Sequence, residues 1–293
     1  MGRQIYAAIV DGILGGGVYG LMAVGLTLIF GVLDVINIAQ GILVVTGAYL
    51  SYVLSVHLHI DLFVGLLVTV PAMFILGLVI YWAFIRPLRG RERTSMSLLA
   101  CYAVAIIIEG VLYRVFGANN QVLQASYTNS TFRLFGFYVT WIYVYGFIMA
   151  VALVVALYWL LYRTRFGRSV RATMQDQTAA RLLGIQVNRV AALTFGIGVA
   201  VTAAGGMVYG ATSGGFNPNS GYDLISRLLA IIILGGLGSI AGALVAGVFM
   251  ITLESLVTIW SPNWAVVVFY VALIAVLTFR PTGLFGKQAV RAQ

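Results

Sequence analysis

The chain has 293 residues, of which 61% are hydrophobic and only 9% are charged, and its formal net charge is +9. Soluble domains are nearer to about 45–50% apolar and about 25% charged, so this composition excludes a water-soluble fold and indicates a lipid solvent. One cysteine and two histidines are too few for a disulfide framework or a multi-cysteine metal site, and we expect no metal and no cofactor.

The apolar runs predict helices. Segments that cross hydrocarbon must satisfy their backbone hydrogen bonds internally, as helices or closed barrels do. The runs are about 20 residues long and lack the alternation of a barrel strand. We therefore predict an all-α fold, a polytopic transmembrane helical bundle of about eight spanning helices plus short broken or re-entrant elements. It forms a single domain over residues 1–293.

The first region of interest, residues 5–57, consists of two apolar segments separated by a polar break at 34–41, which contains Asn37, Gln40 and Gly41. Interrupted segments in both halves of a transporter point to a binding site made from broken helices. Ordinary turns between complete helices give the same pattern, so both interpretations stay open. The side of the N-terminus is also open, because Arg3 favours the cytoplasm and the number of crossings favours the outside.

Basic residues are gathered in short segments between apolar runs, which is typical of the cytoplasmic side of a membrane protein rather than of a nucleic-acid surface. Thirteen of the 17 lie in 86–93, in 163–189 and in the tail from 280 onward, and we place all three segments in the cytoplasm. The polar stretch 117–139 is predicted to be an external loop. The basic residues of the three segments are Arg86, Arg89, Arg91, Arg93, Arg163, Arg165, Arg168, Arg171, Arg181, Arg189, Arg280, Lys287 and Arg291.

Two carboxylates lie within apolar runs: Glu109 deep in 95–116 and Glu254 late in 242–259. A charge at the bilayer centre costs on the order of 2.5–3.5 kcal/mol on the insertion scale, so an intramembrane carboxylate is a candidate functional group. A proton or ion relay needs such groups inside the bundle. One structural carboxylate per helix, facing a partner, gives the same sequence, and both interpretations stay open.

Sequence motifs of catalysis are absent. No G-x-S-x-G elbow occurs, no two carboxylates share a helical face, and His57 and His59 lie together in a predicted external turn. No Walker A loop (G-x-x-x-x-G-K-S/T) occurs, so any ATP must be handled by another chain. We therefore expect a non-catalytic membrane subunit rather than an enzyme.

The segment 163–190 is polar, basic and longer than a turn. It is helix-prone from about 168 to 183 and reaches a C-cap-like break at Gly184. A basic amphipathic helix on anionic lipid would fit this composition. The other interpretation is a docking helix for a cytoplasmic partner.

The second interrupted region, 222–260, has its break at 235–242. The break contains Gly235, Gly236, Gly238 and Ser239. We predict that both breaks line a pathway for a small polar solute. The side chains of Asn37 and Gln40 would hydrogen-bond the solute, and the glycines would expose backbone groups to it.

Four blocks of the sequence resemble the LivH-like permeases of branched-chain amino-acid ABC transporters, and the likeness extends over nearly the whole chain. The blocks are GLMAVGLTLIFGVLDVINIAQGILVVTGAYLSY at 20–52, RPLRGR at 86–91, GRSVRATMQDQTAARLLGIQVNRV at 167–190, and ILGGLGSIAGALVAGVFMITLESL at 233–256 with RPTGLFG at 280–286. The third block is similar to the family's cytoplasmic coupling motif.

The resemblance implies a multi-pass protein of a bacterial-type inner (plasma) membrane and an importer with several chains. These would be two permease subunits, identical or homologous, two cytoplasmic ATP-binding subunits and an external solute-binding protein facing the loop 117–139. A helix at 171–184 would fit a groove on the ATPase. The coupling residues implied by the resemblance are Arg171, Gln175, Asp176, Arg181, Leu183 and Gly184.

One departure bears on the solute. The family's block at 37–42 commonly reads Asn-Phe-Ala-His-Gly-Glu/Asp, whereas this chain reads Asn-Ile-Ala-Gln-Gly-Ile. This departure leaves several solutes open: branched-chain amino acids, other amino acids, amides and urea, all of which related permeases carry. The rival function is a self-sufficient secondary transporter or channel that uses Glu109 and Glu254, and ATP dependence distinguishes the two.

Overall fold

A computed structural model describes residues 2–88, 93–125, 127–128, 130–134 and 137–286. The predicted basic residues Arg89, Arg91, Lys287 and Arg291 lie outside the described residues. Helices make up most of the described chain, with one short hairpin of strands β1 and β2. The elements are α1 (Gly2–Leu33), α2 (Gln40–Leu58), α3 (Leu62–Ile80) continued by the π-helical turn η1 (Tyr81–Ile85), α4 (Arg93–Phe116), β1 (Thr131–Leu134), β2 (Phe137–Thr140), α5 (Trp141–Arg163), α6 (Arg165–Gln175), α7 (Gln177–Leu182), α8 (Val187–Thr212), α9 (Ser220–Gly235), α10 (Ile240–Trp260) and α11 (Pro262–Phe279).

Within the described residues, eight helices are long and apolar enough to cross a membrane. They are α1, α2, α3 with its η1 extension, α4, α5, α8, α10 and α11. Helix α9 has 16 residues, fewer than the roughly 20 that a full crossing needs. The predicted polytopic helical bundle is therefore confirmed, and α9 is its short additional element.

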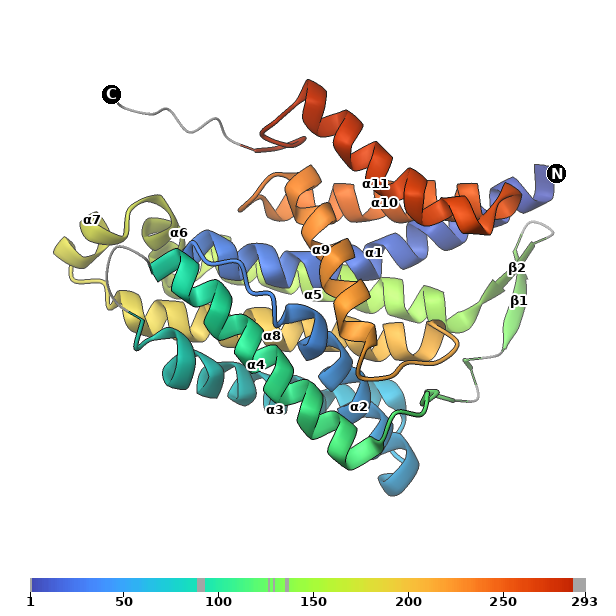
Figure 1. Cartoon of the computed structure of the whole chain (residues 1–293), viewed down its shortest axis with the longest axis horizontal. Helices are drawn as coiled ribbons and strands as arrows, with labels where there is room; N and C mark the ends of the chain where they lie inside the picture. The colour runs from blue at the N-terminus through green and yellow to red at the C-terminus, as the bar shows by residue number, and fades with distance from the viewer. Residues whose placement is uncertain (1, 89–92, 126, 129, 135–136, 287–293) are drawn as a thin grey trace.

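The bundle has two distinct ends (Figure 1). Helices α6 and α7 and the start of α4 lie at one end, and the β1–β2 hairpin lies at the other. Because the described residues of the basic segments 86–93 and 163–189 belong to the first end, the positive-inside rule indicates that it is cytoplasmic and that the hairpin end is external. The start of α1 lies at the hairpin end, which is the external one. This agrees with the number of crossings, and the single Arg3 counts for less than the several basic residues at the opposite end.

Helix α8 is almost wholly buried and packs against α1, α2 and α3, so it forms the centre of the bundle. The most extensive contact between any two helices is that of α1 with α10. A Cβ atom on Gly16 would lie 2.6 Å from Val248 Cα, and one on Gly247 would lie 2.7 Å from Gly20 Cα. Small residues let backbones approach closely in lipid, where packing rather than the hydrophobic effect holds helices together.

Candidate functional site

The predicted break at 34–41 is observed as residues 34–39, which join α1 to α2 without helical structure; we call this segment the first break. Asn37 and Gln40 are completely buried. Asn37 Nδ2 donates to Gln40 Oε1 at 2.8 Å, and Gln40 Nε2 donates to Thr202 Oγ1 of α8 at 2.5 Å. The Thr202 hydroxyl in turn donates to the Gly198 carbonyl at 2.8 Å. These side chains therefore fasten the first break to the central helix.

Two further features belong to this site. Asn37 Oδ1 is buried and has no hydrogen-bond partner within the described residues, although it can accept two bonds. Gly41 sits directly against α9, because a Cβ atom there would overlap Gly221 O and lie 2.9 Å from Ile225 Cβ. The first break thus contacts both the central helix and the short helix.

The second break, residues 236–239, joins α9 to α10. Gly236 and Gly238 have φ values of +95° and +83°, a region that L side chains rarely adopt. Ser239 Oγ accepts from Gly242 N at 3.1 Å and caps α10. The two glycines therefore allow the positive φ values of this break, and the serine caps the helix that follows it.

The second break also packs against the C-terminal segment, residues 280–286. Leu284 N donates to Leu234 O at 2.7 Å, and Phe285 N donates to Gly235 O at 3.2 Å. A Cβ atom on Gly236 would lie 2.6 Å from Gly286 Cα. The predicted glycines Gly235 and Gly236 thus contact the C-terminal segment, whereas Gln40, to which Asn37 bonds, contacts α8.

The predicted cytoplasmic helix over 168–183 is divided in the structure into α6 and α7. Asp176 has extended backbone between them, and its Oδ1 accepts from Thr178 N at 2.7 Å and Ala179 N at 3.0 Å. An aspartate that caps the next helix in this way ends the preceding one. Gly184 follows α7 with φ +79°, which matches the predicted C-cap break.

The six predicted coupling residues have different surroundings. Gln175, Asp176, Arg181, Leu183 and Gly184 are exposed at the cytoplasmic end. Arg171 instead binds within the chain: its Nη1 donates to the Leu161 carbonyl, and its guanidinium lies 4.8 Å from the centre of the Tyr162 ring. It therefore fixes α6 to the end of α5.

Sequence reasoning missed two residues of this segment. Leu182 is 85% exposed beside Leu183 at 79%, a pair of large apolar side chains at the polar end of the molecule. Gln177 Nε2 donates to the Val32 carbonyl at 2.9 Å and so connects α7 to the last turn of α1. The two adjacent leucines in a polar stretch were a readable signal, but nothing local to Gln177 identifies its partner 145 residues away.

The end of α1, just before the first break, lies against the segment 163–190. A Cβ atom on Gly31, near the end of α1, would overlap Met174 Cε of α6 and lie 3.8 Å from Gly238 Cα. Through Gly31, the end of α1 is therefore in contact with α6 and close to the second break. Met174 of α6 and Gln177 of α7 thus both contact residues that precede the first break.

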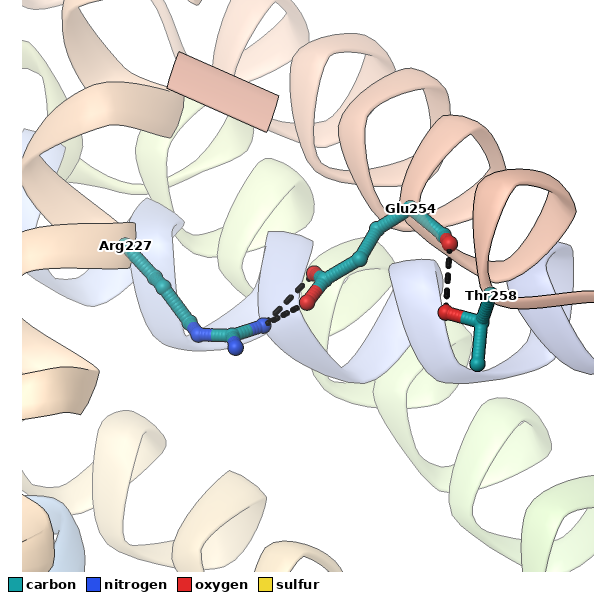
Figure 2. A network of polar contacts seen from close by, with 3 residues as sticks. All are labelled: Arg227, Glu254 and Thr258. Atoms are coloured by element: carbon teal, nitrogen blue, oxygen red, sulfur yellow. Dashed lines mark hydrogen bonds and ion pairs between the residues drawn. The ribbon is translucent and has the colours of Figure 1, made fainter. Parts of the chain in front are cut away.

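Each predicted intramembrane carboxylate has a partner. Glu109 Oε2 accepts from the Tyr222 hydroxyl at 2.6 Å. Arg227 Nη1 of α9 contacts both carboxylate oxygens of Glu254 of α10, at 2.7 and 2.6 Å (Figure 2). Thr258 Oγ1 also donates to the backbone carbonyl of Glu254 at 2.8 Å. This arrangement favours structural pairing over a proton or ion relay.

The described part of the external loop is attached to the bundle at two points. Gln121 pairs with Phe216 across an isolated bridge, and the Tyr127 hydroxyl donates to Asp61 Oδ2 at 2.7 Å. Burial, together with that hydrogen bond, raises the pKa of the Tyr127 phenol above its ordinary value, so the donor keeps its proton. The loop therefore presents an organised surface at the external end.

Within the described residues, no group of three or more His, Cys, Asp or Glu side chains is placed to hold a metal ion. The chemistry that the arrangement supports is hydrogen bonding to a small polar molecule and mechanical connection between the cytoplasmic end and the first break.

Comparison with known proteins gives a match over almost the whole chain. The sequence profile of the family described as "Branched-chain amino acid transport system / permease component" matches residues 8–277. The "High-affinity branched-chain amino acid transport system permease protein BraD" of Pseudomonas aeruginosa is 27% identical, with 96% of each chain covered. LivH of Escherichia coli K12, which carries the same description, is 29% identical over 96% of this chain and 95% of that protein. A "Probable branched-chain amino acid transport permease protein LivH" of Methanocaldococcus jannaschii is 30% identical over 91% and 88%. No solved structure matches the chain.

Proposed function

Because this chain belongs to the family of branched-chain amino acid transport system permeases, we propose that it is the transmembrane permease subunit of an ABC importer. It resides in the inner (plasma) membrane as a multi-pass protein. Its solutes are branched-chain amino acids or related small polar molecules, and ATP is hydrolysed by partner chains. The observation that carries this conclusion is the end-to-end match to permeases of such systems.

The rival function is not favoured. A self-sufficient secondary transporter would need carboxylates free to take up and release an ion during transport. Glu254 is held by Arg227, and Glu109 by Tyr222, so neither is an unpaired charge. Its relatives carry permease descriptions from transport systems of several components, and this chain contains no nucleotide-binding loop.

We propose the following complex. The chain is one permease domain over residues 1–293, and it pairs with a second permease subunit, identical or homologous. Two ATP-binding subunits dock at the cytoplasmic end, and a solute-binding protein docks at the external end. The coupling segment 163–190 contacts an ATPase through α7, and its exposed pair Leu182 and Leu183 supplies apolar surface for the buried core of that interface.

The contacts around the first break support a mechanism of coupling. Nucleotide-driven closure of the ATPases would shift α6 and α7, and Gln177 would transmit this shift to Val32 at the end of α1. Because the first break follows directly, its amide side chains would exchange their bonds to Thr202 for bonds to the solute. The buried Asn37 Oδ1, which has no hydrogen-bond partner in the part of the chain that the structure describes, supports this role. Gly235, Gly236, Gly238 and Ser239 would border the same pathway near its cytoplasmic end.

The proposed function is tested by uptake of labelled leucine into vesicles. The chain is reconstituted with its permease partner and ATPases, and the binding protein is supplied outside. Uptake should require ATP and should stop when the ATPases are omitted. Uptake by the purified chain alone, driven by an ion gradient, would refute the proposal and restore the rival function.

A further inference from the structure

A cavity of about 310 Å³ lies in the external half of the bundle, between α1, α5, α8, α9 and α10. It is lined by the first half of α1, the first turn of α5, the last turns of α8, the first turns of α9 and the second half of α10. Its volume falls at the lower end of the range of roughly 300–1,000 Å³ typical of small-molecule sites. A solute arriving from outside would meet it before reaching either break.

Three charged side chains line this external cavity: Asp11, Asp223 and Arg227. The carboxylates of Asp11 and Asp223 have no hydrogen-bond partner within the described residues; Asp11 is half-buried and Asp223 is exposed. Two carboxylates that line one cavity offer acceptors for an ammonium group, which carries three donors and no acceptor.

The arginine has donors to spare. Arg227 uses Nη1 alone for the ion pair with Glu254, and its Nη2 points away from that carboxylate (Figure 2). Nη2 and Nε form one edge of the planar guanidinium, and neither has a partner within the described residues. Such an edge matches a carboxylate in the bidentate geometry that arginine favours.

The remaining wall is mixed: six side chains carry hydroxyl groups, and five are aliphatic or thioether side chains. The hydroxyl-bearing residues are Tyr19, Tyr143, Tyr209, Thr212, Ser213 and Ser255. Val18, Met22, Val208, Leu224 and Ile251 present buried aliphatic side chains to the cavity from four different helices. An apolar pocket with a few convergent polar groups is the usual form of a small-molecule site. The cavity thus combines an anion-accepting edge, a cation-accepting pair and an aliphatic surface.

We propose that the external cavity binds the zwitterion of a branched-chain amino acid. Arg227 holds the α-carboxylate, Asp11 and Asp223 hold the α-ammonium, and the aliphatic wall receives the branched side chain. This inference rests on the proposed function and names where the solute first contacts the permease. Glu254 acts as a positioning residue, because its ion pair through Nη1 fixes the Arg227 guanidinium and leaves the other edge unbonded.

The test uses the whole permease–ATPase complex in nanodiscs, without the binding protein, and measures equilibrium binding of three probes. The probes are L-leucine, 3-methylbutylamine, which is leucine without its carboxylate, and 4-methylpentanoate, which is leucine without its ammonium. Leucine should bind about 10-fold or more tightly than either analogue, since each analogue leaves charged groups of the cavity unpaired.

Substitutions test the role proposed for each charged residue of the cavity. Asp223→Asn should weaken leucine and 3-methylbutylamine about 10-fold while leaving 4-methylpentanoate unchanged. Asp61→Asn, the same change at an exposed carboxylate that does not line the cavity, is the matched control and should leave the binding of all three probes unchanged. The double variant Arg227→Gln/Glu254→Gln removes the ion pair without stranding a charge, and should abolish the preference for leucine over 3-methylbutylamine.

The outcomes separate this inference from the proposed function. If ATP-driven leucine uptake is normal but the complex does not bind leucine, the cavity is not a solute site and the importer stands. If 3-methylbutylamine binds as tightly as leucine, Arg227 holds no carboxylate and the zwitterion assignment is overturned. Absence of ATP-driven uptake refutes the proposed function itself. Should the double variant fail to assemble, the result with Asp223→Asn still decides the ammonium site.

Discussion

The first break is held to the bundle by amide side chains, whereas the second break is held by its own backbone. At the first break Gln40 reaches across to Thr202, and Asn37 bonds to Gln40. At the second break Gly236 and Gly238 adopt left-handed conformations, and the neighbouring backbone bonds to residues 284 and 285. Side-chain hydrogen bonds can change partner when helices shift, but a backbone packed against another backbone has little room to move. The first break is therefore the better candidate for the moving part of the pathway, and the second for its fixed border.

The largest expected effect is at the second break. Gly236→Ala places a methyl group against Gly286 in a left-handed backbone, and we expect a loss of about 2–5 kcal/mol of stability from strain and overpacking together. Gly238→Ala is the matched control, because its φ is also positive but a Cβ atom there meets nothing within 4 Å. Thermal unfolding of the purified chain measures both. Equal losses in the two variants would show that the packing against the C-terminal segment contributes nothing.

The next effect tests whether the amides at the first break act in transport. Gln40→Leu strands Asn37 in a buried site, and should cost roughly 1–3 kcal/mol of stability and most of the uptake. Replacing both amides, as Asn37→Leu/Gln40→Leu, should restore much of the stability, since it removes the stranded polar group and Thr202 keeps its bond to Gly198. Uptake by vesicles should stay low in the double variant. Recovery of uptake together with stability would make the amides purely structural.

A smaller effect concerns ATPase docking, which drives the proposed movement of the first break. Leu182→Ser/Leu183→Ser removes the exposed apolar pair of α7 and should weaken association with the ATPase by about 2 kcal/mol, the level of an interface hot spot. Co-purification of the ATPase reports the loss, and membrane insertion should be normal. Leu58→Ser, at an exposed leucine of the external end, serves as the control. Unchanged co-purification of the double variant would remove α7 from the interface.

The smallest effect concerns transmission from α7 to the first break. Gln177→Ala removes one partly buried hydrogen bond to Val32 and should cost only about 1 kcal/mol of stability. Its effect should appear as ATP hydrolysis that proceeds with reduced leucine uptake. Gln186→Ala, an exposed glutamine at the same end without a capping bond, should leave the ratio of uptake to hydrolysis at the wild-type value. If Gln177→Ala also keeps the wild-type ratio of uptake to hydrolysis, the hydrogen bond to Val32 does not transmit the movement of α7. The movement would then reach α1 through another contact, such as that between Met174 and Gly31.

Much of the fold follows from local properties of the sequence. The apolar runs predicted the spanning helices, and the polar interruption near Asn37 predicted the first break within two residues of its end. The C-cap at Gly184 was also predictable, because a glycine at positive φ is a local requirement of the chain. The division of 168–183 at Asp176 was missed, since the residues on both sides favour helix and only the capping bonds of its carboxylate separate them.

The sequence by itself determined the solvent, the helical class, the cytoplasmic end and the family, because composition, periodicity and ordered motifs are properties of neighbouring residues. Only the tertiary structure decided which groups meet. Glu109 and Tyr222 are 113 residues apart, Glu254 and Arg227 are 27 apart, and Gln40 and Thr202 are 162 apart. The physical reason is that a polar side chain in a membrane must find a partner, but helix packing over the whole bundle selects which one. The same packing brought Asp11, Asp223 and Arg227 from two helices, α1 and α9, to one cavity, which no spacing along the chain could indicate.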